Sequence, residues 1–408
     1  MNTKVNRAAS SRMKLSFGEG VAIIVGCNIG AGVIGAAKNS SAAGWPIYAI
    51  TLIGICFLTI ISMLYVAETS LRTREPLTLS GLTQKYLGKT WGLFLFTVIA
   101  LYTYGCLVAY AAGSGKILNE LFGIPNALGT IIFFIPAVTV IWFGLKTSGA
   151  SNKIITSGMG LMFITLIIAS IASRNFDGAN ITEAYPEHFL SVIPICIFVF
   201  VSQFIVPELA RGFSHDKKSA ARLPKAIIAG MIISCILLLL VPFAVIGLIP
   251  ISRIASDPDA GVATLVWGRE IGSWAFLFAN FVALMGMMTS FWAIGGTYLS
   301  NIMDQFKQKE FDMRPRLIGT LAVAIPPFIF AYTSVLGFNT ALDLAGALAG
   351  LVMGIIPVAI LRKSRKTGNK EPEWTINNFF AHPILQIILI TVFIYGGISY
   401  IFSFIAGL

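Results

Sequence analysis

The sequence predicts an all-α membrane protein of about 11 transmembrane helices, built as a five-plus-five inverted repeat in which helices one and six are broken. Three observations support this fold class. The chain of 408 residues is 56% hydrophobic and only 12% charged, whereas soluble domains carry about 25% charged residues. Its basic residues are concentrated in every second connection between apolar runs, and two of these runs are interrupted.

The number of spans follows from the apolar runs, because a membrane-spanning helix needs about 20 apolar residues. Eleven runs qualify: 17–37, 45–71, 91–121, 128–145, 153–173, 189–210, 223–249, 272–302, 316–333, 340–361 and 379–406. Residues 1–16 precede the first run. We interpret 17–408 as one transmembrane domain, divided into a first repeat (17–173), a second repeat (189–361) and an extra helix (379–406).

Basic residues gather on one side of this arrangement. The N-terminus and every second connection hold 24 of the 29 Lys and Arg residues, and the other connections hold five. Positive residues stay in the cytoplasm. The sequence therefore predicts a multi-pass protein of the cell membrane with a cytoplasmic N-terminus and an external C-terminus. The net charge of +11 is then a topology signal that also attracts anionic membrane lipids, and we expect no nucleic-acid partner.

The first apolar run contains three glycines between Gly26 and Gly32. Each glycine costs roughly 1 kcal/mol of helix propensity relative to alanine. Non-helical backbone at membrane depth is tolerated where it is buried in protein or lines a cavity. We interpret the stretch as a break in the first helix that faces a binding cavity. The alternative is a glycine-rich face that lets another helix pack closely.

The sixth run contains Pro194 and Pro207, with Phe200, Val201, Ser202 and Gln203 between them. Proline removes a helical hydrogen bond, so this run predicts a second interrupted helix. Alternatively, Pro207 simply ends a helix. Spans one and six each open a set of five spans, and the two sets have opposite orientation. Paired interruptions of this kind indicate a transporter with inverted repeats, whose binding site lies at the breaks.

Short motifs in the same order resemble the amino acid/auxin permease family, in its aromatic amino-acid permease-like branch, within the amino acid, polyamine and organocation superfamily. The resemblance extends from about residue 17 to 306 and rests on these motifs: Gly30-Ala31-Gly32-Val33-Ile34-Gly35, Ala43-Gly44-Trp45, Glu68-Thr69-Ser70, Gly144-Leu145-Lys146, Ser151-Asn152-Lys153, Pro194 and Pro207 around Phe200, and Thr289-Ser290-Phe291. It implies the inverted-repeat fold and amino-acid transport. Two positions depart from the family pattern: Ala37 replaces a usual proline, and Val201 or Ser202 replaces a usual glycine.

An amino acid presents a carboxylate and an ammonium group to such a site. Backbone N–H groups at the start of a half-helix suit the carboxylate, and free carbonyls at the end of the other half-helix suit the ammonium. Aromatic side chains would shape an apolar pocket, although each could equally be ordinary packing. The substrate-binding candidates are Gly26, Asn28, Ile29, Gly30, Ala31, Gly32, Phe198, Phe200, Val201, Ser202, Gln203, Tyr104 and Trp292.

For the coupling ion we expect Na⁺ or H⁺, and we expect no cofactor and no metal centre. In sodium-coupled relatives of this fold, hydroxyl groups of span eight bind the cation, which makes Thr289 and Ser290 candidates by resemblance. Their alternative role is hydrogen bonding between helices. Glu68 and Glu19 could carry a proton, because intramembrane charges are often functional. Glu68 could instead form an i,i+4 pair with Arg72.

Lys38 ends span one and Asp343 opens span ten on the external side, so we predict that they form an outer gate. Alternatively they are unrelated interfacial charges, with Lys38 reaching the headgroups and Asp343 favouring a helix N-terminus.

Together these observations predict a secondary active transporter that moves amino acids, aromatic or other neutral ones, by cation-coupled symport with alternating access. We expect no enzyme, because the apolar runs hold no cluster of His, Asp and Glu and the chain has no nucleotide-binding motif. The alternatives are a membrane channel or a transporter-like nutrient sensor.

Overall fold

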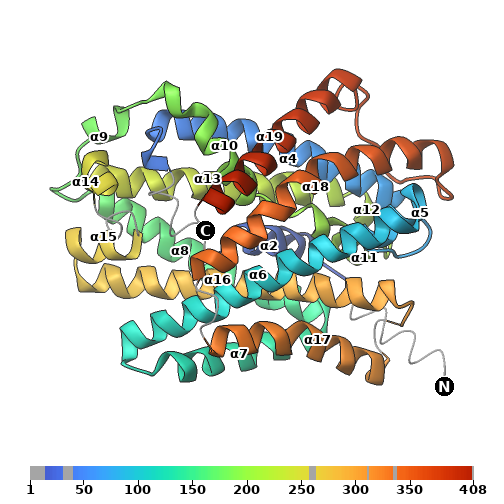
Figure 1. The fold of residues 1–408 in the computed structure, drawn as a ribbon, viewed down its shortest axis with the longest axis horizontal. Coiled ribbons are helices and arrows are strands. Elements are labelled where there is room, and N and C mark those ends of the chain that lie inside the picture. Colours follow the sequence, from blue (N-terminus) through green and yellow to red (C-terminus); the bar gives the residue numbers. More distant parts are fainter. Residues whose placement is uncertain (1–13, 31–39, 257–262, 310–311, 334–337, 407–408) are drawn as a thin grey trace.

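The computed structural model describes residues 14–30, 40–256, 263–309, 312–333 and 338–406. All regular secondary structure in these ranges is helical, and the long helices run roughly parallel to one axis of the molecule (Figure 1). Nine helical segments of the described chain are long and apolar enough to cross a membrane, and α2 is a shorter apolar helix. The prediction of an all-α, multi-pass membrane protein is confirmed.

The helices follow the predicted order of spans. In the first half they are α2 (Phe17–Asn28), α4 (Trp45–Leu71), α6 (Lys89–Phe122), α7 (Asn126–Phe143) and α8 (Leu145–Ile171). In the second half they are α10 (Phe189–Phe198) with α11 (Val206–Phe213), then α13 (Leu223–Leu248), α16 (Ser273–Gln305), α17 (Met313–Tyr332), α18 (Phe338–Thr367) and α19 (Pro383–Ala406). Short helices α5 (Leu79–Leu87), α9 (Ala179–Thr182), α12 (Lys217–Ala220), α14 (Ile251–Ser256) and α15 (Ala263–Glu270) fill the connections.

The first predicted break is present. Helix α2 begins with a capping box, in which the Ser16 hydroxyl accepts from the Glu19 N–H and the Glu19 carboxylate accepts from the Ser16 N–H at 2.7 Å. It ends at Asn28, and the Ile29 N–H still donates to the Val25 carbonyl at 2.8 Å. A helix of 12 residues spans only about 18 Å, roughly half of a membrane core.

The sixth span is also broken. Helix α10 ends at Phe198, and two tight turns follow it. In these turns the Phe200 N–H donates to the Ile197 carbonyl and the Val201 N–H donates to the Phe198 carbonyl. The 3₁₀ turn η3 (Gln203–Ile205) then leads into α11. Pro207 lies in the first turn of α11, where a missing N–H costs nothing. The proline therefore starts a half-helix, and the alternative that it ends one is wrong.

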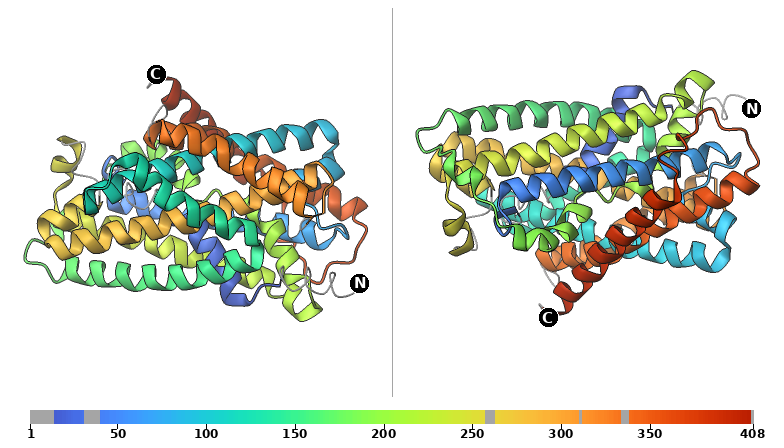
Figure 2. Two further views of the ribbon diagram at one scale, coloured as in Figure 1. Left: turned by 90° about the horizontal axis from the view of Figure 1, so that it is seen from below. Right: turned by 90° about the horizontal axis from the view of Figure 1, so that it is seen from above.

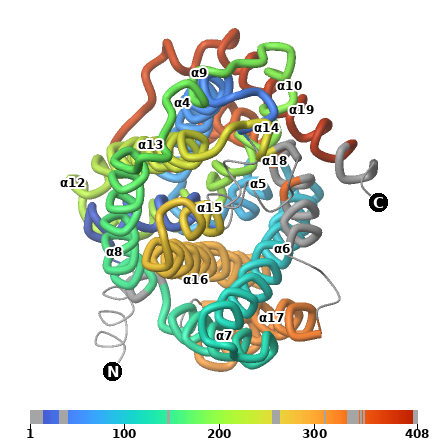
Figure 3. The backbone as a smooth tube through the Cα atoms, turned by 90° about the vertical axis from the view of Figure 1, so that its left-hand side faces the viewer, coloured from blue at the N-terminus to red at the C-terminus, as the bar shows by residue number. Residues whose placement is uncertain are grey.

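The first broken helix lies in the interior, where α2 packs against α13, α8 and α16. Helix α10 packs against α4 and α19, and its first residues, Phe189 and Leu190, are exposed. Helix α19 crosses the outside of the bundle obliquely (Figure 2). One end of the molecule, which we call the N-terminal face, carries the start of α2 together with α5 and α12 (Figure 1). The opposite face carries α9, α14 and α15, and Figure 3 views the bundle from that end.

Three predicted boundaries are wrong, two of them because polar helical turns escape an apolar-run criterion. Helix α8 begins at Leu145 instead of residue 153, directly after Gly144 (φ 93°) ends α7. Helix α18 runs to Thr367 instead of 361, since its last turns carry arginines that are paired with other side chains. The last helix begins at Pro383, because residues 379–382 form a turn around the Asn377 carbonyl.

Candidate functional site

The end of α2 contacts the middle of α16 through two adjacent hydroxyl groups. The Ser290 hydroxyl donates to the Gly26 carbonyl at 2.6 Å. The Thr289 hydroxyl donates to the Gly286 carbonyl at 3.0 Å and also lies 3.5 Å from the Gly26 carbonyl. All of these groups are buried. The hydroxyls of span eight therefore meet the carbonyl groups that the first break exposes.

Glycines make this approach possible. A Cβ atom at Gly286 would lie 2.7 Å from the Ile29 carbonyl oxygen, which is shorter than any normal contact. A Cβ atom at Gly26 would overlap the Oδ1 of Asn152 in α8 and would lie 2.9 Å from the Thr289 Cβ. Three backbone carbonyls, those of residues 26, 29 and 286, and two hydroxyls, those of Thr289 and Ser290, consequently gather between α2 and α16.

Gly30 faces a second hydroxyl group that the sequence analysis missed. A Cβ at this position would lie 2.6 Å from the Ser290 Oγ and 3.1 Å from the Tyr110 hydroxyl. Tyr110 lies on α6 and is 5% exposed. No local pattern singles out this tyrosine among the 11 in the chain. Only the packing of α6 against α16 brings it to the break.

Two amide side chains flank the first break. Asn28 donates through Nδ2 to the Ser234 hydroxyl at 3.3 Å and to the Met231 sulfur at 3.2 Å, both on α13. Asn152 donates through Nδ2 to the Ser148 carbonyl at 2.9 Å. The Oδ1 atoms of Asn28 and Asn152 are buried and have no hydrogen-bond partner among the described residues. Buried acceptors without a partner are rare, so these two atoms are candidates for contact with a ligand or water.

Side chains close to the sixth break form hydrogen bonds with its backbone. The Tyr102 hydroxyl donates to the Val201 carbonyl at 3.3 Å, and the Ser202 N–H donates to the Oε1 of Gln203 at 3.1 Å. The Ser202 hydroxyl donates to the Phe200 carbonyl at 3.3 Å. The Nε2 of Gln203 is buried without a partner in the described part of the chain, which leaves one donor available at this break.

Some predicted site residues lie elsewhere. The Tyr104 hydroxyl donates to the Ala322 carbonyl of α17 at 2.8 Å, and the Phe198 ring packs on Tyr400 of α19 with centroids 5.9 Å apart. The structure does not bring these two side chains to the first break. Trp292 lies one turn closer to the N-terminal face than Thr289. Ala31, Gly32 and Lys38 lie outside the described residues, as does the side chain of Asp343.

The two acidic residues of the sequence analysis are engaged in structural contacts. Glu19 caps α2. Glu68 accepts from the Nε of Arg72 at 2.8 Å, which confirms the predicted i,i+4 pair. It also accepts two hydrogen bonds from Arg365 of α18, at 2.8 and 2.9 Å, and one from the backbone N–H of Ile376 at 2.9 Å.

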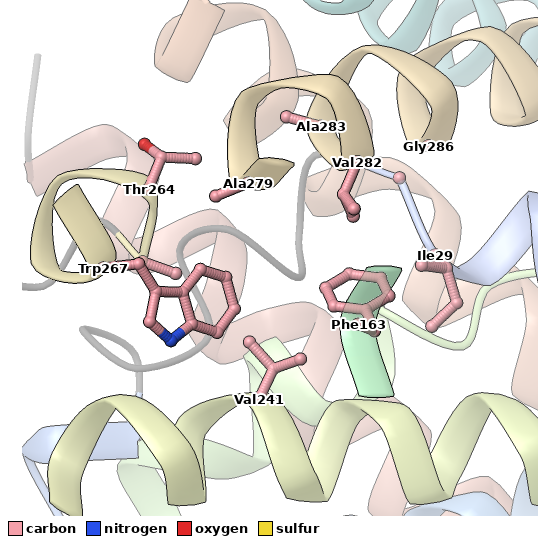
Figure 4. A pocket seen from close by; sticks show the side chains of 11 residues that line it. Ile29, Phe163, Val241, Thr264, Trp267, Ala279, Val282, Ala283 and Gly286 are labelled. Atoms are coloured by element: carbon pink, nitrogen blue, oxygen red, sulfur yellow. The ribbon is translucent and has the colours of Figure 1, made fainter. Parts of the chain in front are cut away.

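A narrow cavity of about 10 Å³ adjoins the first break on the side of the opposite face (Figure 4). Ile29, Phe163, Val241 and Trp267 surround it, and Gly286 lies at its edge. The Trp267 indole donates to the Ser170 hydroxyl at 2.9 Å, so its ring is fixed in place. An apolar space of this kind suits a hydrophobic group more than a charge.

Comparison with known proteins identifies the family. The family model described as "Tryptophan/tyrosine permease family" matches residues 13–398. The chain belongs to the tryptophan/tyrosine permease family. The predicted resemblance to aromatic amino-acid permeases is thus confirmed, and as a member of a permease family this protein is not an enzyme.

Curated relatives of this permease cover most of its length. A "Tryptophan-specific transport protein" from Haemophilus influenzae is 25% identical and aligns with 85% of this chain and 87% of its own. The "Tyrosine-specific transport system 1" of the same organism is 23% identical over 84% of this chain and 87% of its own. A "Glutamine transporter 2" from Aliivibrio fischeri is 20% identical over 88% of this chain and 92% of its own.

Among solved structures, the permease is similar to Mhp1, a nucleobase-cation-symport-1 family transporter in a closed conformation with a bromovinylhydantoin bound. The TM-score is 0.65, the sequence identity is 14%, and the match covers 97% of this chain and 92% of the other. This similarity bears on the fold alone, and it confirms the five-plus-five arrangement with two broken helices.

Proposed function

We propose that this permease is a secondary active transporter that carries aromatic or other neutral amino acids across the cell membrane by cation-coupled symport. The observation that supports this most is the end of α2, where buried carbonyls and unpartnered polar atoms face the hydroxyls of α16. The relatives, which include tryptophan, tyrosine and glutamine transporters, indicate the substrate class.

The proposed substrate site lies between the two breaks. The carboxyl end of a helix carries partial negative charge, so the end of α2 suits the substrate's ammonium group. The unpartnered Oδ1 atoms of Asn28 and Asn152 are further acceptors for it. On the other side, the Nε2 of Gln203 and the Tyr110 hydroxyl are donors for the carboxylate. Together with Gly30 and Ser202, these groups offer both a donor side and an acceptor side.

The proposed coupling ion is Na⁺, bound by the carbonyls of residues 26, 29 and 286 and by the hydroxyls of Thr289 and Ser290. Unwound carbonyls at the end of a half-helix are typical ligands for a coupling cation in transporters of this architecture. Hydrogen bonding between helices is the competing role of the same hydroxyls. Proton transfer by Glu19 or Glu68 is less favoured, because capping and ion pairing occupy their carboxylates.

We further propose that the N-terminal face is cytoplasmic, because most of the basic residues lie in the connections of that side. We also propose that Lys38 and Asp343, whose side chains lie outside the described residues, form a gate on the external side.

The test is uptake of labelled tryptophan, tyrosine, phenylalanine and glutamine into proteoliposomes, with sodium and pH gradients imposed separately. We expect a sodium gradient to drive uptake. Ser290→Ala should raise the sodium concentration for half-maximal uptake by about tenfold, as for the loss of one hydrogen bond to a charged group. Thr165→Val, at an exposed position of α8, is the matched control. Uptake that follows only the pH gradient would exclude the sodium site.

A further inference from the structure

A second small cavity lies on the other side of the first break, toward the N-terminal face. Its volume is about 20 Å³, roughly enough for one water molecule. Ile23 of α2, Ile205 of η3 and Glu208 of α11 line it. Trp292 and Thr297 of α16 line it as well, together with residues of α7, α8 and α17. Residues of both broken helices and of unbroken helices thus border this space.

The cavity lies about one helical turn from the contact between α2 and α16 at the first break. Ile23 lies one turn before Gly26 in α2, and Ala293 lies one turn after Thr289 in α16. These helices touch at the contact between Gly26 and Ser290. A molecule that leaves the first break toward the N-terminal face, between α2 and α16, therefore passes through the cavity.

The walls of this cavity offer opposite chemistries. Glu208 is 4% exposed, and its carboxylate accepts from the Nη1 of Arg211 at 3.2 Å. The Nε1 of Trp292 is buried and has no hydrogen-bond partner in the described chain. Arg316 also reaches the cavity, and its guanidinium donates to the carbonyls of Ile141 and Trp142 at the end of α7. Buried donors are almost always paired, so this indole N–H is available to a ligand that enters the cavity.

We propose that this cavity is a second station for the transported amino acid, between the first break and the N-terminal face. Glu208 faces the ammonium group, and the Trp292 indole donates to the carboxylate. A zwitterion suits a wall that combines a carboxylate with Arg316 and an indole N–H, whereas a bare cation would meet Arg211 and Arg316 as like charges. This station rests on the proposed function and names the path of its substrate.

The small volume means that the station is closed here. An amino acid fits only when α11 and α16 separate, as alternating access requires of the two helix groups. Gly296 offers a direct way to block it. This residue lines the cavity, and a Cβ atom there would meet no heavy atom within 4 Å. The Cβ atom of a larger side chain at Gly296 would therefore not clash with any neighbour.

The test measures KM for the transported amino acid from each side, in vesicles of both orientations. We expect Glu208→Gln to raise KM at the N-terminal face about tenfold more than KM at the opposite face, since a lost charge-assisted hydrogen bond has roughly this effect. Gly296→Leu should change the ratio in the same direction, because its side chain takes up space beside the cavity. Glu208→Asp keeps the charge and should restore most of the affinity. Gly54→Leu is the matched control, because Gly54 lies on α4 and its Cβ position is also open. Equal changes on both sides would overturn the station.

A second readout covers variants that are inactive in both directions. Gly296→Cys places a thiol beside the cavity, and the native cysteines are all buried. We expect a membrane-impermeant thiol reagent to label it from the N-terminal face and saturating amino acid to slow the labelling. Labelling that is unaffected by substrate would contradict the proposal. If the unmodified protein transports no amino acid, the proposed function fails; if it transports and the variants keep the same ratio of KM values, only the station fails.

Discussion

Two buried carboxylates near the N-terminal face have opposite surroundings. Glu68 of α4 is 0% exposed and accepts four hydrogen bonds, from Arg72, twice from Arg365, and from the Ile376 N–H. Glu208 of α11 is 4% exposed and borders a cavity. Burial and charge are thus nearly the same at both sites. Their neighbours differ: arginines and a backbone N–H enclose Glu68, whereas Glu208 lines a cavity that a ligand could enter.

The contacts around Glu68 join three parts of the chain. Arg365 reaches Glu68 from the end of α18, and its Nη2 also donates to the Ile376 carbonyl at 3.3 Å. The backbone N–H groups of Asn369 and Lys370 donate to the Arg72 carbonyl. The segment between α18 and α19 is therefore fastened across the end of α4. Since the lone pairs of Glu68 are used in these contacts, we infer a structural role for it.

The largest effect should come from Glu68→Gln. The substitution leaves two arginines near the membrane interior without their common partner, and breaking a buried ion pair typically costs about 3–5 kcal/mol. We expect a marked drop in the apparent melting temperature of the purified protein in detergent. Glu208→Gln should lower it less, because the Nε of Arg211 keeps its hydrogen bond to the Pro76 carbonyl.

If Glu208→Gln were the more destabilising of the two, the contrast between a structural and a ligand-facing carboxylate would be wrong. If Glu68→Gln left stability intact but changed the response to a pH gradient, the proton-carrying role that the sequence first indicated would return for this residue.

A smaller effect is expected from Arg365→Lys. Lysine keeps the charge but loses the planar fork that donates twice to Glu68. The loss of one charge-assisted hydrogen bond corresponds to about 1.5–3 kcal/mol. The partner variant Arg72→Lys replaces a single donor and should cost less, because the ammonium group can still approach the carboxylate. Equal melting temperatures for the two variants would show that geometry contributes nothing beyond charge.

Glu19, the third acidic residue near this face, belongs to the capping box that stabilises the N-terminus of α2. Ser16→Ala removes the hydroxyl that accepts from the Glu19 N–H, and the loss of such a cap costs about 1 kcal/mol. Ser157→Ala, at an exposed serine within α8, is the control. We expect a measurable fall in melting temperature for the cap variant and almost none for the control. A similar fall in both would mean that the cap contributes little to stability.

The sequence predicted features whose cause is local. Three glycines marked the first break, two prolines marked the sixth, and the spacing of Glu68 and Arg72 predicted their pair. It did not predict Arg365 as a partner of Glu68, because these residues are 297 positions apart and meet only when α18 packs on α4.

Residues that only tertiary packing brings to the site were not predicted as site residues. Tyr110 lies in an apolar run without a local signal, and Asn152 was named only as part of a family motif. The close approach at Gly30 and Gly26 brings both to the break. Glu208 follows Pro207 near the end of an apolar run, where a charge normally marks the membrane surface. The structure instead continues this span to Phe213 and buries the carboxylate.

The smallest effect should come from the exposed carboxylate of Glu75, in the connection between α4 and α5. Its ion pair with Lys85, supported by hydrogen bonds from Asn369, lowers its pKa to about 2. A lowered folded-state pKa stabilises the protein above the unfolded value of about 4.5, and this contribution is lost as the pH falls toward 2. The Glu75 side chain is 51% exposed, so solvent screening limits the gain to about 0–1 kcal/mol. Glu75→Gln should therefore lower the melting temperature slightly at neutral pH and not at all near the lowered pKa. If Glu75→Gln lowered the melting temperature as much as Glu68→Gln does, the exposure of a carboxylate would not predict its contribution to stability.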